Sequence, residues 1–195
     1  MKRLFCLRTP EKFGRSLGQG GFTLIETLVT IAIAAILMSM AAPSMRNLIE
    51  RNSVADSVDS FVSAISHARA EAIRRGLPVT LCRSINAATS ATPACSADPA
   101  WEAGWMAFVD LDGDGTFESI HGDSLLRVQG ALNKSGGIRQ GTYASLRFRP
   151  TGTLKNGAST FIFKSPSNNE SLQRGVCVGF VGRVRLISGT ESCSS

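Results

Sequence analysis

An apolar run from Phe22 to Ala42 carries one charged residue, Glu26, and directly follows a glycine pair, Gly20-Gly21. About 20 apolar residues are enough to cross a bilayer as a helix. An ordinary secretory signal is cut after its apolar region, whereas the small residues here precede it. The sequence therefore predicts cleavage between Gly21 and Phe22, which keeps the apolar segment in the mature protein. Because an ionisable group inside a spanning helix is costly and usually functional, we expect Glu26 to meet a cationic partner.

Alternating aspartates, Asp110, Asp112 and Asp114, precede a glycine and match the start of a calcium-binding loop, D-x-D-x-D-G. Carboxylates at such positions can converge on one hard cation. The twelfth position, however, is His121, where that loop needs a bidentate glutamate, and the preceding segment resembles a strand rather than a helix. Aspartate and glycine also favour tight turns. We therefore prefer a polar hairpin turn and keep calcium as the alternative.

Two arginines alternate with a valine in Gly182-Arg183-Val184-Arg185. If this segment is extended, both arginines point to one side and Val184 to the other. Guanidinium pairs suit phosphate contacts, and Gly182 would let another backbone approach closely. Paired arginines are also common on a solvated strand face, which is the interpretation that spacing alone favours.

Motifs for catalysis are missing from the sequence. It contains no G-x-S-x-G nucleophile motif, no glycine-rich phosphate loop and no zinc-ligand constellation. We expect the protein not to be an enzyme and to need no cofactor.

The basic charge of the chain is concentrated at its N-terminus. Residues 1–21 hold five of the 21 basic residues and one of the 15 acidic residues, which leaves 16 and 14 in the remaining 174 residues and a net charge near +2. A basic leader predicts a cytoplasmic N-terminus. Because the remainder is nearly balanced, any nucleic-acid binding must come from a local patch.

Four cysteines follow the leader, namely Cys82, Cys95, Cys177 and Cys193. An even number in a domain on the oxidising side of the membrane predicts two disulfides. Three pairings are possible, and we favour the two that are local in sequence, Cys82–Cys95 and Cys177–Cys193. Metal binding by these cysteines is disfavoured because no C-x-x-C pair occurs.

One long helix is predicted from Phe22 to Arg75, running past Pro43. Its first half is apolar all round, and its second half has one apolar face, with Gly76 and Pro78 ending it. We divide the chain into a leader (1–21), a membrane and assembly segment (22–50) and a globular domain (51–195).

Strand-like segments follow the helix, separated by glycine, asparagine and proline. The predicted strands are Val79–Arg83, Gly104–Asp110, Ser124–Val128, Tyr143–Arg149, Ser159–Lys164 and Val176–Leu186. A long helix packed on antiparallel strands is an α+β domain.

The order of these features resembles the GspH/FimT family of type IV minor pilins and type II secretion pseudopilins. The likeness rests on the Gly21-Phe22 junction, Glu26, the Gly104–Asp110 segment and the Gly182–Arg185 motif. It implies a type IV pilin-like fold, cleavage by a prepilin peptidase and N-methylation of Phe22. It also implies that Glu26 pairs with the freed amino terminus of another pilin subunit during assembly.

The resemblance further implies a single-pass protein of the bacterial inner membrane, with a periplasmic domain, that enters a pilus or pseudopilus. FimT-like members bind DNA through a Gly-Arg-x-Arg segment during natural transformation. On that basis we expect Gly182, Arg183 and Arg185 to contact double-stranded DNA without sequence preference. The alternative is a structural role, either in initiating a pilus or as a type II secretion pseudopilin without DNA binding.

Overall fold

The computed structural model describes residues 21–98, 101–132, 135–140, 143–189 and 191–193. Its long helix, α1, spans Leu24–Arg75 and passes through Pro43. The described residues up to Pro43 and the residues Ser44–Ser195 form two compact units. In the first unit nearly all side chains are exposed, and α1 is long and apolar enough to cross a membrane.

The second half of α1 buries one apolar face. Its buried side chains recur mainly at steps of three or four residues, as the sequence predicts: Val54, Val58, Phe61, Ala64, Ile65, Ala68 and Ala72. Phe61 is fully buried, and its ring centroid lies 5.3 Å from that of Trp101, 5.2 Å from that of Trp105 and 4.7 Å from that of Phe161. These rings belong to separate elements, so the helix joins them into one core.

The helix ends where glycine and proline predict. The Gly76 amide donates to the Ala72 carbonyl at 3.0 Å, and Gly76 has φ +65°. Glycine adopts this left-handed conformation without a Cβ penalty, which makes it a common helix terminator. Pro78 follows and cannot continue the helix, so the first strand begins at Val79.

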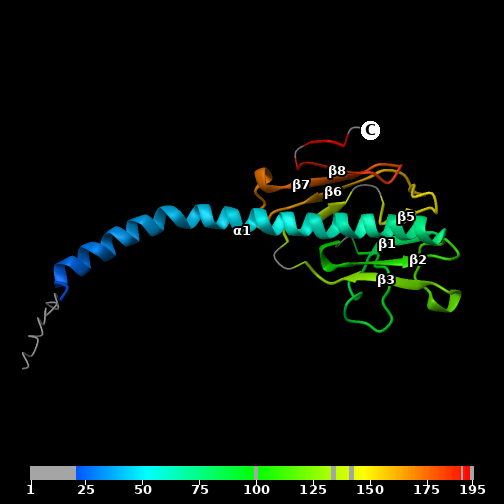
Figure 1. Ribbon diagram of the computed structural model, residues 1–195, viewed down its shortest axis with the longest axis horizontal. Helices are drawn as coiled ribbons and strands as arrows, with labels where there is room; N and C mark the ends of the chain where they lie inside the picture. Colours follow the sequence, from blue (N-terminus) through cyan, green and yellow to red (C-terminus); the bar gives the residue numbers. More distant parts are fainter. Residues whose placement is uncertain (1–20, 99–100, 133–134, 141–142, 190, 194–195) are drawn as a thin grey trace, which may run out of the picture. The chain divides into compact units, whose positions relative to one another are not determined.

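Within the described residues, eight strands form two antiparallel sheets that pack on the second half of α1 (Figure 1). Sheet A has the order β3 (Ser124–Gln129), β2 (Trp105–Val109), β1 (Val79–Arg83), β5 (Ser145–Phe148). Sheet B has the order β4 (Ile138–Gln140), β6 (Ser159–Phe163), β7 (Arg174–Val178), β8 (Val184–Ser188). Short 3-10 helices occupy Trp101–Ala103, Ser119–His121 and Glu170–Leu172. The two edge strands of sheet B are therefore β4 and β8.

The α+β prediction is confirmed, with two corrections in sheet B. The predicted single strand Val176–Leu186 is wrong, because a tight turn over residues 179–183 divides it into β7 and β8. In addition, β4 was not predicted, since three residues carry too little periodicity to be recognised. In sheet A the expected alternation is present, with Leu146 and Phe148 buried on β5.

Candidate nucleic-acid interface

The Gly182–Arg185 motif lies where the β7–β8 turn enters the edge strand β8. The Gly182 amide donates to the Gly179 carbonyl, and the Gly179 amide donates to the Arg183 carbonyl, each at 2.8 Å. Only Val184 onward is extended, and Arg185 stands opposite Cys177 on β7. Arg183 and Arg185 are both exposed, whereas Val184 is half-buried and packs on the core. The two arginines therefore remain accessible, one at the turn and one on the strand.

Gly182 itself is buried, and the backbone that approaches it belongs to this chain. It has φ +72°, and a Cβ at this position would lie 2.4 Å from the Gly152 carbonyl oxygen and 2.7 Å from the Arg69 Nε. The same Arg69 Nε donates to the Gly152 oxygen at 3.0 Å. Gly182 thus allows the close backbone approach that the sequence predicted, and the backbone that approaches it is that of Gly152 in the same chain.

A second turn, over residues 149–152, packs beside the β7–β8 turn. The Gly152 amide donates to the Arg149 carbonyl at 2.8 Å, and the Leu154 amide donates to the Phe180 carbonyl at 2.8 Å. Arg149 is exposed. Among the described residues, neither the Arg149 nor the Arg183 guanidinium makes a hydrogen bond or ion pair with another side chain. The fold therefore brings two exposed arginines from adjacent turns to the same end of the domain.

Other basic side chains that could extend this patch do not join Arg149 and Arg183 at this end of the domain. The Arg147 guanidinium donates to the Asp114 carbonyl. Arg174 pairs in register with Ser188, whereas Val178 pairs with Val184 at the turn. At about 3.4 Å per residue, four residues of strand place Arg174 roughly 14 Å from the turn along β7. Lys164 follows the end of β6 that lies beside Arg174, so it belongs to the same distant end.

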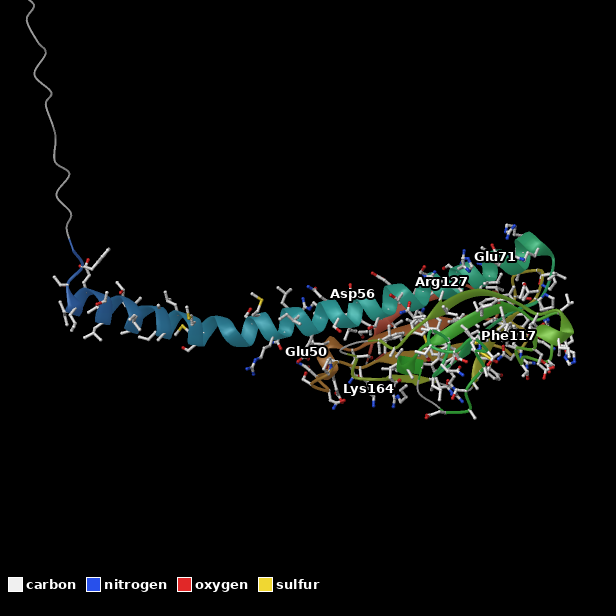
Figure 2. All side chains as sticks on the ribbon, turned by 90° about the horizontal axis from the view of Figure 1, so that it is seen from below. Glu50, Asp56, Glu71, Phe117, Arg127 and Lys164 are labelled. Carbon is white, nitrogen blue, oxygen red and sulfur yellow. A yellow bond between two sulfur atoms is a disulfide. The ribbon has the colours of Figure 1, made fainter. Side chains whose placement is uncertain are left out.

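Two arginines at the end of α1 are held by one carboxylate, Glu71. The Arg74 Nη2 and the Arg75 Nε each lie 2.6 Å from Glu71 Oε2, and Figure 2 labels Glu71 on this last stretch of the helix. Hydrogen bonds from Arg74 and then Arg75 lower the pKa of Glu71 from 4.5 to about 2. The pKa of Arg74 is raised in return, mainly by its hydrogen bond to Glu71. Their charges are therefore partly neutralised within the chain.

The segment expected to be processed is open in the structure. Gly21, Phe22 and Thr23 precede α1 and are exposed. Thr23 caps the helix, since its Oγ1 accepts from the Glu26 amide at 3.3 Å. Glu26 is also exposed and lies in the first helical turn, where the helix dipole favours a negative charge. Its carboxylate is thus available to a neighbouring chain.

Both of the favoured disulfides are present in the structure. Cys82 pairs with Cys95, and Cys177 pairs with Cys193. The first bond ties the loop after β1 to that strand. The second ties the C-terminal segment to β7, directly opposite Arg185. It therefore limits movement of the sheet that carries the arginines.

The aspartates of the calcium-like motif do not all meet. Asp110 and Asp112 lie together with Asp123, and one carboxylate oxygen from each lies within 4.8 Å of the others. Asp114 is not part of this cluster, and its Oδ1 accepts from the Thr116 amide at 2.6 Å. The calcium alternative, which the sequence analysis placed below a polar turn, grouped Asp114 with Asp110 and Asp112, whereas the structure groups Asp123 with them. Asp123 was not among the residues selected from the sequence. Its one signal is its position, directly before the strand β3.

Comparisons with known proteins cover both halves of the chain. A family model described as "Type II transport protein GspH" matches residues 57–182, and a model of the "Prokaryotic N-terminal methylation motif" matches residues 17–42. Two curated proteins from Pseudomonas aeruginosa, each named "Fimbrial protein", are 32% identical over 122 residues, which are 61% of this chain and 71% of each relative.

Two crystal structures of the type IV minor pilin FimU from Pseudomonas aeruginosa have a similar fold. Their TM-scores are 0.56 and 0.52, at sequence identities of 18% and 16%. The matches cover 73% and 70% of this chain and 93% and 94% of the FimU chains. The likeness therefore extends over nearly the whole of those structures, including a helix packed on antiparallel sheets.

Proposed function

Since this chain belongs to the GspH family of type IV pilin-like proteins, as its sequence motifs predicted, we propose that it is a minor type IV pilin that binds double-stranded DNA during natural transformation. The interface consists of Arg183 and Arg185, extended by Arg149 from the adjacent turn. The observation that carries the proposal is the exposure of these three arginines at one end of the domain.

The chemistry of the interface is that of phosphate contact. Exposed guanidinium groups donate to phosphate oxygens from a planar fork, and such contacts carry no sequence information. A rigid turn lowers the entropy cost of presenting them, and the Gly182–Gly152 packing and the Cys177–Cys193 bond both limit movement here. The interface should therefore bind any duplex sequence with similar, modest affinity.

Salt dependence gives the expected size of the effect. Each contacted phosphate adds roughly 0.9 to the slope of log affinity against log salt. Contacts from Arg183 and Arg185 alone give a slope near −1.8, so affinity should fall at least about tenfold between 50 and 200 mM salt. Replacing either Arg183 or Arg185 by alanine should weaken all sequences alike and reduce the slope by about 1.

The test is a titration of a fluorescent duplex with the full chain in a non-ionic detergent, at several salt concentrations. The parent is compared with the Arg183→Gln/Arg185→Gln double variant, with Arg149→Gln, and with Arg139→Gln as a matched control. Arg139 is exposed on the opposite edge strand, β4. The double variant should lose binding, Arg149→Gln should weaken it, and the control should bind like the parent.

A transformation assay completes the experiment. The double variant should transform poorly while still being assembled into the fibre. If it binds DNA and transforms like the parent, the arginines form only a solvated face. A structural role then replaces the proposal, either in pilus initiation or as a pseudopilin of type II secretion. In that case deletion of the chain should abolish piliation or secretion.

Membrane insertion and processing belong to the same proposal. We expect the chain to lie in the inner membrane with its domain in the periplasm, and to be cut after Gly21 by a prepilin peptidase. The exposure of residues 21–23 supports this part of the proposal. Glu26 would then pair with the methylated Phe22 amino group of an adjacent subunit. Mass spectrometry of membrane-extracted protein should detect a chain that begins at methylated Phe22, and a mature N-terminus beyond Ala42 would exclude this processing.

A further inference from the structure

The connection between β2 and β3 gathers three carboxylates, from Asp110, Asp112 and Asp123. Asp110 directly follows β2, and Asp123 directly precedes β3, so the two strands bring the ends of the connection together. One oxygen from each of the three side chains lies within 4.8 Å of the others. Like charges at this separation repel each other unless a cation or a proton lies between them.

Asp110 is the most deeply buried carboxylate of this group. It is 1% exposed. Its Oδ2 accepts from the Thr80 hydroxyl at 2.6 Å, but its Oδ1 is buried and has no hydrogen-bond partner among the described residues. A buried carboxylate oxygen without a partner is costly, and buried charges are normally paired or bound to a metal.

The other two carboxylates are held in place by backbone amides. Asp123 is 7% exposed, and its two oxygens accept from the Leu111 and Glu118 amides, each at 2.9 Å. Asp112 is more exposed, and its Oδ1 accepts from the Asp114 amide at 3.2 Å. Each oxygen keeps a second lone pair that can bind a cation. The loop therefore positions its ligands before any ion arrives.

Nearby basic side chains do not neutralise the two buried carboxylates, Asp110 and Asp123. The Lys155 Nζ donates to the Gly113 carbonyl at 2.8 Å, and the Arg147 guanidinium donates to the Asp114 carbonyl. His121 contacts Asp112 and Glu118, with its Nδ1 3.5 Å from the Asp112 Oδ2. Within the described part of the chain, no ion pair reaches Asp110 or Asp123. No basic side chain of the described residues therefore balances their charges.

We propose that Asp110, Asp112 and Asp123 bind a calcium ion that fixes the β2–β3 connection. All three donors are carboxylate oxygens, which hard cations prefer. Two oxygens on opposite sides of a calcium ion, at about 2.4 Å each, are about 4.8 Å apart, so three oxygens that lie within 4.8 Å of one another can share one ion. Loop carbonyls and water complete the six to eight ligands that calcium takes.

This site differs from the loop that the sequence pattern suggested. In a helix-flanked calcium loop the third aspartate, here Asp114, is a ligand, and the twelfth residue is a glutamate. Here a strand precedes the motif, the twelfth residue is His121, and the third carboxylate is supplied by Asp123. Asp114→Asn therefore distinguishes the two arrangements, because asparagine retains the acceptor for the Thr116 amide.

The experiment uses the full chain in a non-ionic detergent, stripped with a chelator and then titrated with calcium chloride by calorimetry. A magnesium chloride titration serves as the comparison. Calcium should bind with a dissociation constant of about 0.1–1 mM, as in extracellular calcium modules. At 5 mM calcium the midpoint of thermal unfolding should then rise by about 2–9 °C, with a smaller rise for magnesium.

Three variants decide which residues bind the ion. Asp112→Asn and Asp123→Asn should each weaken calcium binding at least tenfold, and Asp114→Asn should bind like the parent. Asp112 is exposed, so its variant remains informative even if Asp123→Asn unfolds. The proposal is overturned if the folded parent binds no calcium at 5 mM, if magnesium binds equally well, or if Asp114→Asn loses binding while Asp112→Asn retains it.

Discussion

Gly182→Ala tests whether the glycine of the arginine motif serves packing or ligand binding. Alanine at φ +72° costs about 1–2 kcal/mol, because the left-handed region brings Cβ close to the following carbonyl. The new Cβ would also lie 2.4 Å from the Gly152 oxygen and 2.7 Å from the Arg69 Nε, so one or both must move. Losing the charged hydrogen bond between them costs a further 1.5–3 kcal/mol or so.

These contributions predict a loss of about 2.5–5 kcal/mol in the free energy of unfolding. For a domain of this size, about 1 kcal/mol shifts the midpoint of thermal unfolding by 2–4 °C, so the expected decrease is about 5–20 °C. The measurement is thermal unfolding of the full chain in detergent, followed by the fluorescence of the buried Trp101 and Trp105.

Gly179→Ala is the matched control, because Gly179 belongs to the same turn. A Cβ there would lie 3.8 Å from its nearest neighbour, the Arg183 carbonyl oxygen, and Gly179 does not have a positive φ. Its midpoint should stay within about 2 °C of the parent, as for ordinary surface substitutions. The packing argument fails if Gly182→Ala leaves the midpoint unchanged and instead weakens DNA binding.

Three further perturbations test the core, a disulfide and the helix terminus. Phe61→Ala removes the ring that joins α1 to four other aromatic side chains, and it should cost about 3–5 kcal/mol in denaturant unfolding. A loss below 1 kcal/mol would contradict its central position. Cys177→Ser/Cys193→Ser opens a loop with a sequence separation of 16 and should lower the free energy of unfolding by about 3 kcal/mol in the same assay. An unchanged denaturation midpoint would show that the bond does not constrain the unfolded chain. Glu71 should titrate near pH 2 by NMR and return toward 4.5 in Arg74→Ala/Arg75→Ala. Because its folded pKa is depressed, its stabilising effect is complete above about pH 4.5 and is lost as the pH falls through 2.

Local patterns were sufficient for the long helix, for most of the strands and for the N-terminal methylation motif. The three- and four-residue spacing from Val54 to Ala72 specified the buried face of α1, and Gly76 with Pro78 specified its end. The alternation around Leu146 and Phe148 likewise specified the buried face of β5. Such signals are readable because a side chain's direction follows directly from the backbone period of its own element. Both disulfides join cysteines that are close in sequence, which also made their pairing accessible.

Sequence alone thus determined a membrane-length helix, an α+β domain and a set of chemically capable residues. The tertiary structure decided which of these residues meet. It separated Asp114 from Asp110 and brought Asp123 to it, because the β2–β3 pairing joins the two ends of the connection. It also placed Arg149 near the turn of Arg183, and it turned Gly182 toward Gly152 rather than toward a ligand. These contacts join residues distant in the chain, and their geometry depends on strand register and sheet packing, which no local periodicity encodes.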